Sequence, residues 1–246
     1  MQVGSINPTV VILAGGYGTR IKSLYPDIPK ILIPIAGRPF IEWLLEYFIS
    51  QGLKRFIFCL GHLAEVFEKY LEKHPHPRLD ILTVREDAPL GTGGALLLAC
   101  KSFDAGSPFV VSNGDSLVLA DLSKAFELMK DPKIDGALLG VHAEDASRYG
   151  TLHVSPQGDL LSFIEKRAGS GTVNAGVYFF KSHLLNDFPE RVPLSIEADI
   201  FPRLLNNGAR ISVCHSEGSF IDIGTPDALQ SAQSFINRCF PFRGML

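Results

Sequence analysis

The sequence lacks the features that mark a membrane, secreted or zinc-binding protein. No run approaches the roughly 20 apolar residues that cross a bilayer. The first nine residues have neither the basic cluster nor the apolar segment of a secretory signal. The four cysteines are scattered without C-x-x-C spacing, which argues against a zinc or redox motif. We therefore expect a cytoplasmic protein that has no membrane partner.

A strong excess of one charge is also missing. The formal net charge is −3, and lysine and arginine form no cluster along the chain, which argues against a nucleic-acid partner. An anionic substrate would have to be held by a few placed cations. With 246 residues, of which 46% are hydrophobic, the chain is long enough to build one sizeable core.

Strand-like and helix-like segments alternate in the first half. Short apolar, β-branched runs predict strands, and apolar residues at helical spacing predict helices between them. The predicted strands are 9–13, 55–60, 79–84 and 109–112, and the predicted helices are 40–51, 62–73, 92–101 and 121–130. This order indicates a Rossmann-like α/β fold, a three-layer αβα sandwich around a mainly parallel sheet. Ligands bind beyond the carboxyl ends of such strands, so the loops after Leu13, Val84 and Ser112 are the expected binding loops.

The second half has a different pattern. The predicted strands are 136–142, 150–154, 160–165, 172–180, 210–215 and 219–223, and a closing helix spans 226–238. Turn signals between these segments favour antiparallel additions that make the sheet mixed. Because no linker or low-complexity segment divides the chain, we expect a single domain over residues 1–246.

A glycine-rich loop follows the first strand, where residues 13–20 read LAGGYGTR. Its three glycines allow backbone N–H groups to approach a phosphate or a base closely. No Gly-Lys-Ser/Thr follows, so the loop is not a P-loop, and the third glycine of the dinucleotide-binding fingerprint is missing. Arg20 ends the loop and Lys30 comes soon after it. Phosphoryl and nucleotidyl transfer need placed cations of this kind, because charge spreads over phosphate oxygens in the transition state.

Residues 13–20 together with Pro29-Lys30 resemble the signature of the sugar-phosphate nucleotidylyltransferases, and the resemblance continues almost to the C-terminus. It implies a magnesium-dependent enzyme that joins a nucleoside monophosphate to a sugar 1-phosphate and releases pyrophosphate. Residues 9–135 would form the nucleotide-binding half, and residues 136–246 the sugar-phosphate-binding half. The nucleotide-binding positions would be Leu13, Ala14, Gly15, Gly16, Gly18, Thr19, Glu86, Gly91, Thr92, Asn113 and Gly114.

Glu86 follows the third predicted strand, in the segment EDAPLGTGG. The resemblance places it against the Watson–Crick edge of the base, with Gly91 beside it. An ionised carboxylate only accepts hydrogen bonds, which matches the adjacent N–H donors of guanine, whereas uracil and thymine suit an amide better. We therefore expect GTP in preference to UTP or dTTP. The alternative is that Glu86 is a solvated charge at a strand end.

Two aspartates lie in apolar strands that are far apart in the sequence. Asp115 ends one of these strands, and Asp222 interrupts the other. Asp115 and Asp222 need a partner if they are buried, and magnesium takes one or two carboxylates together with phosphate oxygens and waters. The resemblance assigns both residues to the metal. The alternatives are a turn-forming role for Asp115 and a helix-capping role for Asp222, although Thr225 could cap that helix instead.

The resemblance also assigns the sugar 1-phosphate to positions in the second half. These positions are Gly150, Glu165, Lys166, Asn174, Gly176 and Glu197. Asn174 lies in a strand that is too apolar to need an amide for packing. Glu165-Lys166 as a surface pair and Glu197 as an acid at a helix start are the alternatives. Many relatives have proline after the lysine, where this chain has Arg167.

The mechanism implied by the resemblance is direct in-line displacement, catalysed by Arg20, Lys30 and Lys166 with Mg²⁺. Within the family, the chain is most similar to enzymes that transfer guanylyl to D-glycero-α-D-manno-heptose 1-phosphate. Mannose 1-phosphate is the near alternative, and uridylyl or thymidylyl transfer to a hexose 1-phosphate is more distant. The chain could be a monomer or a homo-oligomer.

Two rival functions come from outside this family of enzymes. A non-catalytic nucleotide-sugar sensor is the first, but such proteins can lose a catalytic cation or carboxylate, and both cations and both aspartates are present here. The second is a glycosyltransferase of similar fold, which would carry Asp-x-Asp where this chain has Asn113-Gly114-Asp115.

Overall fold

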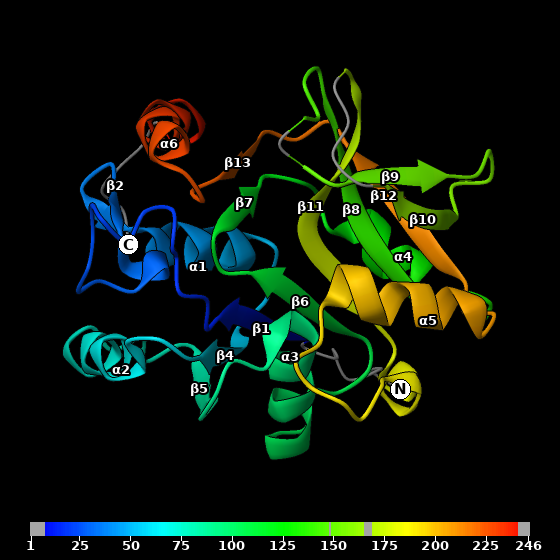
Figure 1. Cartoon of the computed structure of the whole chain (residues 1–246), viewed down its shortest axis with the longest axis horizontal. Helices are drawn as coiled ribbons and strands as arrows, with labels where there is room; N and C mark the ends of the chain where they lie inside the picture. Colours follow the sequence, from blue (N-terminus) through cyan, green and yellow to red (C-terminus); the bar gives the residue numbers. More distant parts are fainter. Residues whose placement is uncertain (1–7, 148, 165–168, 241–246) are drawn as a thin grey trace.

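A mixed sheet of nine strands forms the centre of the computed structural model, which describes residues 8–147, 149–164 and 169–240 (Figure 1). Its main path runs β10-β9-β11-β6-β1-β4-β5, with β8 paired to β11 and β12 paired to β8. The strands are β1 (Thr9–Ala14), β4 (Arg55–Leu60), β5 (Asp80–Arg85), β6 (Phe109–Asn113), β8 (Gly136–Ala143), β9 (Thr151–Val154), β10 (Leu160–Ile164), β11 (Gly171–Phe180) and β12 (Ile211–Ser216).

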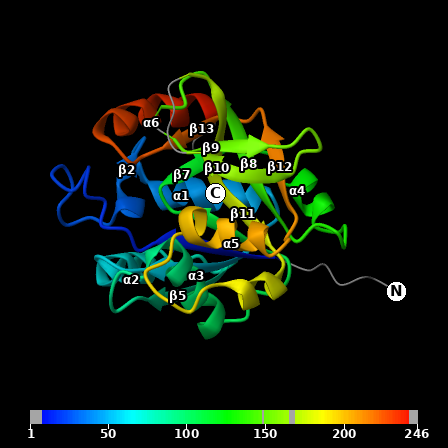
Figure 2. The same ribbon diagram turned by 45° about the vertical axis from the view of Figure 1, so that its right-hand side comes forward.

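Helices cover both faces of this sheet. They are α1 (Phe40–Ser50), α2 (Ala64–Lys73), α3 (Gly91–Ser102), α4 (Ser123–Leu128), α5 (Phe201–Asn206) and α6 (Pro226–Cys239), with shorter turns η1 (Lys30–Leu32), η2 (Ser182–Asp187) and η3 (Ile196–Ile200). In Figures 1 and 2 α6 lies near the top of the molecule, and α2 and α3 lie in its lower half. None of the helices among the described residues is both long and apolar enough to cross a membrane.

The central strand β1 is apolar throughout because both of its faces are buried. Val10 and Ile12 pack into a core that includes side chains of α1, α2 and α6, whereas Val11 packs into a second core with side chains of α3 and α5. Successive side chains of a strand point to opposite faces, so a run such as TVVIL supplies both cores. The predicted three-layer α/β sandwich is therefore confirmed.

Parallel pairing brings the ends of the central strands together. β1 pairs in parallel with β4 and with β6, and β4 pairs in parallel with β5. Leu13 is opposite both Cys59 and Asn113 in this register. The loops that follow these strands therefore leave the sheet at one edge, as expected for parallel strands with crossover helices.

The second half departs from the sequence prediction in two ways. β12 pairs with β8 in parallel rather than antiparallel, because a crossover that contains α5 returns the chain to the sheet edge. The strand predicted at 219–223 does not join the main sheet. It forms β13 (Phe220–Asp222), which pairs only with β7 (Ser116–Val118) in a small antiparallel ribbon. A further two-stranded ribbon consists of β2 (Pro34–Ile35) and β3 (Arg38–Pro39).

Two short helices also differ from the prediction. α5 was not predicted, since six residues carry little periodicity, and its Pro202 is tolerated only because it lies in the first turn. α4 begins at Ser123 rather than at 121, and the Asp121 carboxylate accepts the Ser123 N–H at 2.9 Å just before the helix. The bounds of β4 agree with the prediction to the residue.

Candidate active site

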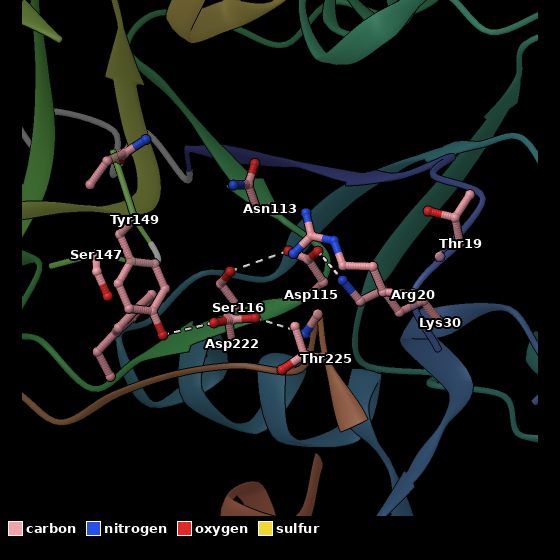
Figure 3. Close-up of a pocket in the computed structure, with 14 residues that line it drawn as sticks. Thr19, Arg20, Lys30, Asn113, Asp115, Ser116, Ser147, Tyr149, Asp222 and Thr225 are labelled. Carbon is pink, nitrogen blue, oxygen red and sulfur yellow. Dashed lines mark hydrogen bonds and ion pairs between the residues drawn. The ribbon is translucent and has the colours of Figure 1, made fainter. Parts of the chain in front are cut away.

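Two adjoining cavities lie at the carboxyl ends of β1 and β6. The charged cavity, of about 570 Å³, is lined by Arg20, Lys30, Asp115, Tyr149 and Asp222, among others (Figure 3). The apolar cavity, of about 290 Å³, is lined mainly by the loop after β1 and by the start of α3. Lys30, Asn113 and Asp115 line both cavities, so the two spaces adjoin at these residues.

Most of the predicted nucleotide-binding residues line the apolar cavity. They are Leu13, Ala14, Gly15, Gly16, Glu86, Gly91, Thr92, Asn113 and Gly114, whereas Gly18 and Thr19 line the charged cavity. Tyr17, Ile31, Pro89 and Ala95 complete the walls of the apolar cavity. Its mainly apolar walls suit a flat ring.

Glu86 is one of the charged groups that line the apolar cavity. It is half-buried, and its Oε2 accepts the Leu90 N–H at 3.0 Å. Burial raises the pKa of Glu86, and the hydrogen bond from Leu90 opposes this shift. A Cβ atom built on Gly15 would lie only 2.3 Å from Glu86 Oε1. The glycine therefore provides the close approach between the loop and the carboxylate, and Glu86 is not a freely solvated charge.

The cations and the carboxylates meet in the charged cavity. The Lys30 ammonium forms an ion pair with Asp115 Oδ2, and Asp115 Oδ1 accepts a hydrogen bond from Ser116 Oγ at 3.2 Å. Figure 3 shows the exposed side chain of Arg20 reaching over Asp115 from the other wall. The two predicted cations thus face the first predicted metal carboxylate.

Asp222 enters the same cavity from the ribbon β13–β7. Its Oδ2 accepts a hydrogen bond from the Tyr149 hydroxyl at 2.8 Å, and its Oδ1 accepts the Gly224 N–H at 2.7 Å. A Cβ atom on Gly224 would lie 3.4 Å from Lys30 Nζ, so the lysine lies beside the glycine whose N–H binds this carboxylate. The helix cap is Thr225, which accepts the Ala228 N–H at 3.3 Å. Capping of α6 therefore does not explain Asp222.

The predicted sugar-binding residues divide between two places. Gly150, Asn174 and Glu197 line a third space, the outer cavity, of about 650 Å³, which adjoins the charged cavity through Tyr149 and Asn174. Gly176 lines none of the three cavities. It has φ +73°, and a Cβ there would lie 2.6 Å from Asn113 Nδ2. Glu165, Lys166 and Arg167 lie outside the described residues.

Asn174 corrects one argument from the sequence. Its amide does have a packing role: Oδ1 accepts the Gly176 N–H at 3.0 Å, and Nδ2 donates to the Tyr178 hydroxyl at 2.8 Å. The pairing of β11 with β8 shifts register between Asn174 and Tyr178, and the amide bonds to the backbone in this irregular stretch. The Tyr178 hydroxyl in turn donates to Glu197 Oε1 at 2.6 Å.

The sequence reasoning missed two side chains at the site. Neither Tyr149 nor Tyr178 is among the site residues predicted from the sequence. Tyr178 is fully buried, and burial together with the nearby Glu197 raises its pKa well above the ordinary value, so it remains a neutral donor. The local sequence does not signal the contacts of these two tyrosines. Tyr149 and Asp222, for example, are 73 residues apart.

The carboxylates of the charged cavity are compatible with a hydrated divalent ion but not with a cage of protein ligands. Over residues 8–147, 149–164 and 169–240, no group of three or more His, Cys, Asp or Glu side chains could hold a metal. Magnesium is commonly bound by one or two carboxylates, with phosphate oxygens and waters supplying the other ligands. Asp115 and Asp222 both line the charged cavity, and the ion pair of Lys30 with Asp115 indicates a place that favours positive charge.

An α/β sheet whose strand ends carry a glycine loop, two cations and two carboxylates is the framework of an enzyme that transfers phosphate groups. The chain belongs to the nucleotidyl transferase family, whose sequence profile matches residues 9–238.

Two relatives and one solved structure show which proteins of that family the chain is similar to. It is 37% identical over 218 residues to D-glycero-alpha-D-manno-heptose 1-phosphate guanylyltransferase of Campylobacter jejuni, covering 88% of this chain and 95% of that protein. HddC from Yersinia pseudotuberculosis complexed with GMP-PN has a TM-score of 0.82 and 34% identity, covering 93% of this chain and 99% of that one. Mannose-1-phosphate guanylyltransferase of Mycobacterium tuberculosis is 30% identical over 88% of this chain and 61% of that protein.

Proposed function

We propose that the chain is a guanylyltransferase that converts GTP and D-glycero-α-D-manno-heptose 1-phosphate into GDP-heptose and pyrophosphate. The observation that carries this proposal is that the two cavities adjoin. Glu86 lines the apolar cavity, and Lys30 and Asp115 line both the apolar and the charged cavity. A nucleotide with its base in the first would place its phosphates in the second.

Guanine fits the apolar cavity better than the other bases because of Glu86. An ionised carboxylate accepts two hydrogen bonds and donates none, which matches the N1–H and N2–H donors of guanine. Leu90 already donates to Oε2, but each carboxylate oxygen has a second lone pair to offer. The guanylyltransferase relatives and the GMP-PN complex of HddC support the same choice.

The reaction needs positioning and neutralisation of charge more than acid–base catalysis. A phosphate oxygen of the sugar 1-phosphate attacks the α-phosphorus of GTP, the bond to the β-phosphate oxygen breaks, and pyrophosphate leaves with that electron pair. The attacking oxygen is already anionic, so no general base is required. Arg20 and Lys30 hold the triphosphate and stabilise the charge that develops on it, and we assign Lys166 to the phosphate of the sugar.

We assign a Mg²⁺ site to Asp115 and Asp222. When bound there, the ion would neutralise phosphate charge and polarise the phosphoryl oxygens. Residues 1–246 would act as one domain, with the nucleotide held by residues 9–135 and the sugar phosphate by residues 136–246. The outer cavity, with Gly150, Asn174 and Glu197, supports the second assignment. We expect the enzyme in the cytoplasm, as a monomer or a homo-oligomer.

Mannose 1-phosphate is the second candidate substrate, favoured by the identity to the mycobacterial mannose enzyme. The identity to the heptose enzyme is higher, 37% rather than 30%, and the match covers 95% of that relative rather than 61%, so we place heptose first. Uridylyl or thymidylyl transfer ranks lower because of Glu86. A non-catalytic sensor ranks lowest, because Arg20, Lys30, Asp115 and Asp222 are all present.

The test is a pyrophosphate-release screen that pairs GTP, ATP, UTP and dTTP with heptose, mannose and glucose 1-phosphates in the presence of Mg²⁺. We expect release with GTP and heptose 1-phosphate at the highest kcat/KM. Activity with UTP or dTTP but not with GTP would overturn the assignment of Glu86. Pyrophosphate release with none of the pairs would overturn the assignment of the chain as an enzyme of these substrates.

A further inference from the structure

Tyr149 contacts both ends of the strand that carries the second metal carboxylate. Its hydroxyl donates to Asp222 Oδ2 at 2.8 Å, and its ring packs edge-on against Phe220, with centroids 5.5 Å apart. Phe220 and Asp222 are two residues apart on β13 and therefore share a face. Tyr149 thus contacts both side chains on this face of the strand.

This contact matters because β13 lies outside the main sheet. The strand is three residues long and pairs with β7 in a separate two-stranded ribbon, and such ribbons are marginally stable when isolated. The Ile223 N–H donates to the Asp115 carbonyl at 2.8 Å, which ties the backbones of the two carboxylate residues together. The Asp222 carboxylate is held at both oxygens, because Oδ1 accepts the neighbouring Gly224 N–H and Oδ2 accepts the Tyr149 hydroxyl. Tyr149 thus adds a side-chain contact from a distant segment of the chain.

Tyr149 also stands between two spaces. It lines the charged cavity and the outer cavity, a property that it shares with Asn174. In Figure 3 the ring forms one end wall of the charged cavity, and its hydroxyl points to Asp222. A sugar 1-phosphate that extends from the charged cavity into the outer cavity must therefore pass this ring.

We propose that Tyr149 is a positioning residue, whose hydroxyl holds Asp222 for the divalent ion and whose ring supports the sugar 1-phosphate. This inference rests on the proposed function, in particular on Asp222 as a metal ligand. The hydroxyl is a neutral donor, so it orients the carboxylate without cancelling its charge and leaves lone pairs for the ion. Removal of the hydroxyl should weaken metal binding, and removal of the ring should also weaken sugar binding.

The experiment separates these two roles with Tyr149→Phe and Tyr149→Ala. Mn²⁺ binding to the full chain without substrates is measured by electron paramagnetic resonance, and steady-state KM values are measured for GTP and for the sugar 1-phosphate. We expect Tyr149→Phe to weaken Mn²⁺ binding roughly tenfold, as is common for groups that orient a metal ligand. The KM for GTP should change less than about twofold, and the KM for the sugar 1-phosphate should rise only with Tyr149→Ala.

A matched control is Tyr47→Phe, which removes another tyrosine hydroxyl that donates a hydrogen bond, here to the Ala120 carbonyl at 2.9 Å. This variant should lose some stability but bind Mn²⁺ like the wild type. Unchanged Mn²⁺ affinity in Tyr149→Phe would overturn the proposal, as would a wild type that binds no Mn²⁺. Because the measurement uses Mn²⁺ alone, a wrong substrate assignment would appear in the pyrophosphate screen and not here.

Discussion

Replacement of Lys30 by alanine should nearly abolish turnover while leaving the fold intact. The ammonium group lies in the charged cavity against Asp115 and close to Gly224 beside Asp222. In the proposed complex it would contact the triphosphate where negative charge develops. The loss of one such preorganised donor typically costs about 10²- to 10³-fold in kcat, or roughly 3 to 4 kcal/mol.

The cost to stability should be much smaller. The side chains of Lys30 and Asp115 are 17% and 40% exposed, so solvent screens the ion pair, and pairs of this kind contribute about 1 kcal/mol or less. We therefore expect kcat with GTP and sugar 1-phosphate to fall at least about 100-fold. The free energy of unfolding in urea should change by no more than about 1 kcal/mol.

The matched control is Lys22→Ala. Lys22 is exposed and lines neither the charged nor the apolar cavity, so its replacement removes one positive charge from the same region without touching the site. Both variants are assayed for pyrophosphate release and for urea unfolding. A loss of less than about threefold in Lys30→Ala, or an equal loss in Lys22→Ala, would refute the reasoning, because local charge at the site could then not be the cause.

Two further predictions concern the base and the backbone. Glu86→Gln replaces an acceptor by a donor, so the KM for GTP should rise about tenfold while UTP or dTTP gains activity; unchanged nucleotide preference would argue against a base contact. In the wild type, burial raises the pKa of Glu86, and protonation adds a donor that faces the donors of guanine. GTP affinity should therefore fall as the pH drops through that raised pKa, and the fall should be absent in Glu86→Gln. Gly91→Ala should lower the free energy of unfolding by about 2 kcal/mol or more, because Gly91 has φ +74° and a Cβ would lie 2.3 Å from the Leu194 carbonyl oxygen. Gly16→Ala, with nothing within 4 Å of its Cβ, is the control and should stay within about 1 kcal/mol.

The parts of the fold that could be predicted are those determined by local pattern. β1 and β4 are apolar runs buried on both faces, and such runs identify central parallel strands wherever they occur. Once those strands are placed, topology brings the loops predicted after Leu13, Val84 and Ser112 to one edge of the sheet. The gathering of Arg20, Lys30 and Asp115 at one cavity therefore followed from the order of strands and from three short segments of sequence.

The remaining features depend on contacts between residues that are distant in the sequence. The hydrophobic periodicity of the sequence does not predict such contacts. β13 reads as one more apolar strand, yet it leaves the main sheet because its partner is β7. The direction of β12 depends on a crossover with an unpredicted helix. The irregular stretch of β11 gives Asn174 a backbone partner, Gly176, that a regular strand would not offer. The bond from Tyr149 to Asp222 exists only in the folded chain.

The most direct measurement is a phosphorus NMR spectrum of one mixture that contains the protein, Mg²⁺, GTP and D-glycero-α-D-manno-heptose 1-phosphate. If one cleft holds both phosphate groups in line, the triphosphate and monoester signals should disappear together. Pyrophosphate and the coupled pair of signals of a GDP-sugar should then appear in equal amounts. Release of orthophosphate with the sugar phosphate left intact, or no change with any sugar 1-phosphate tried, would contradict the account.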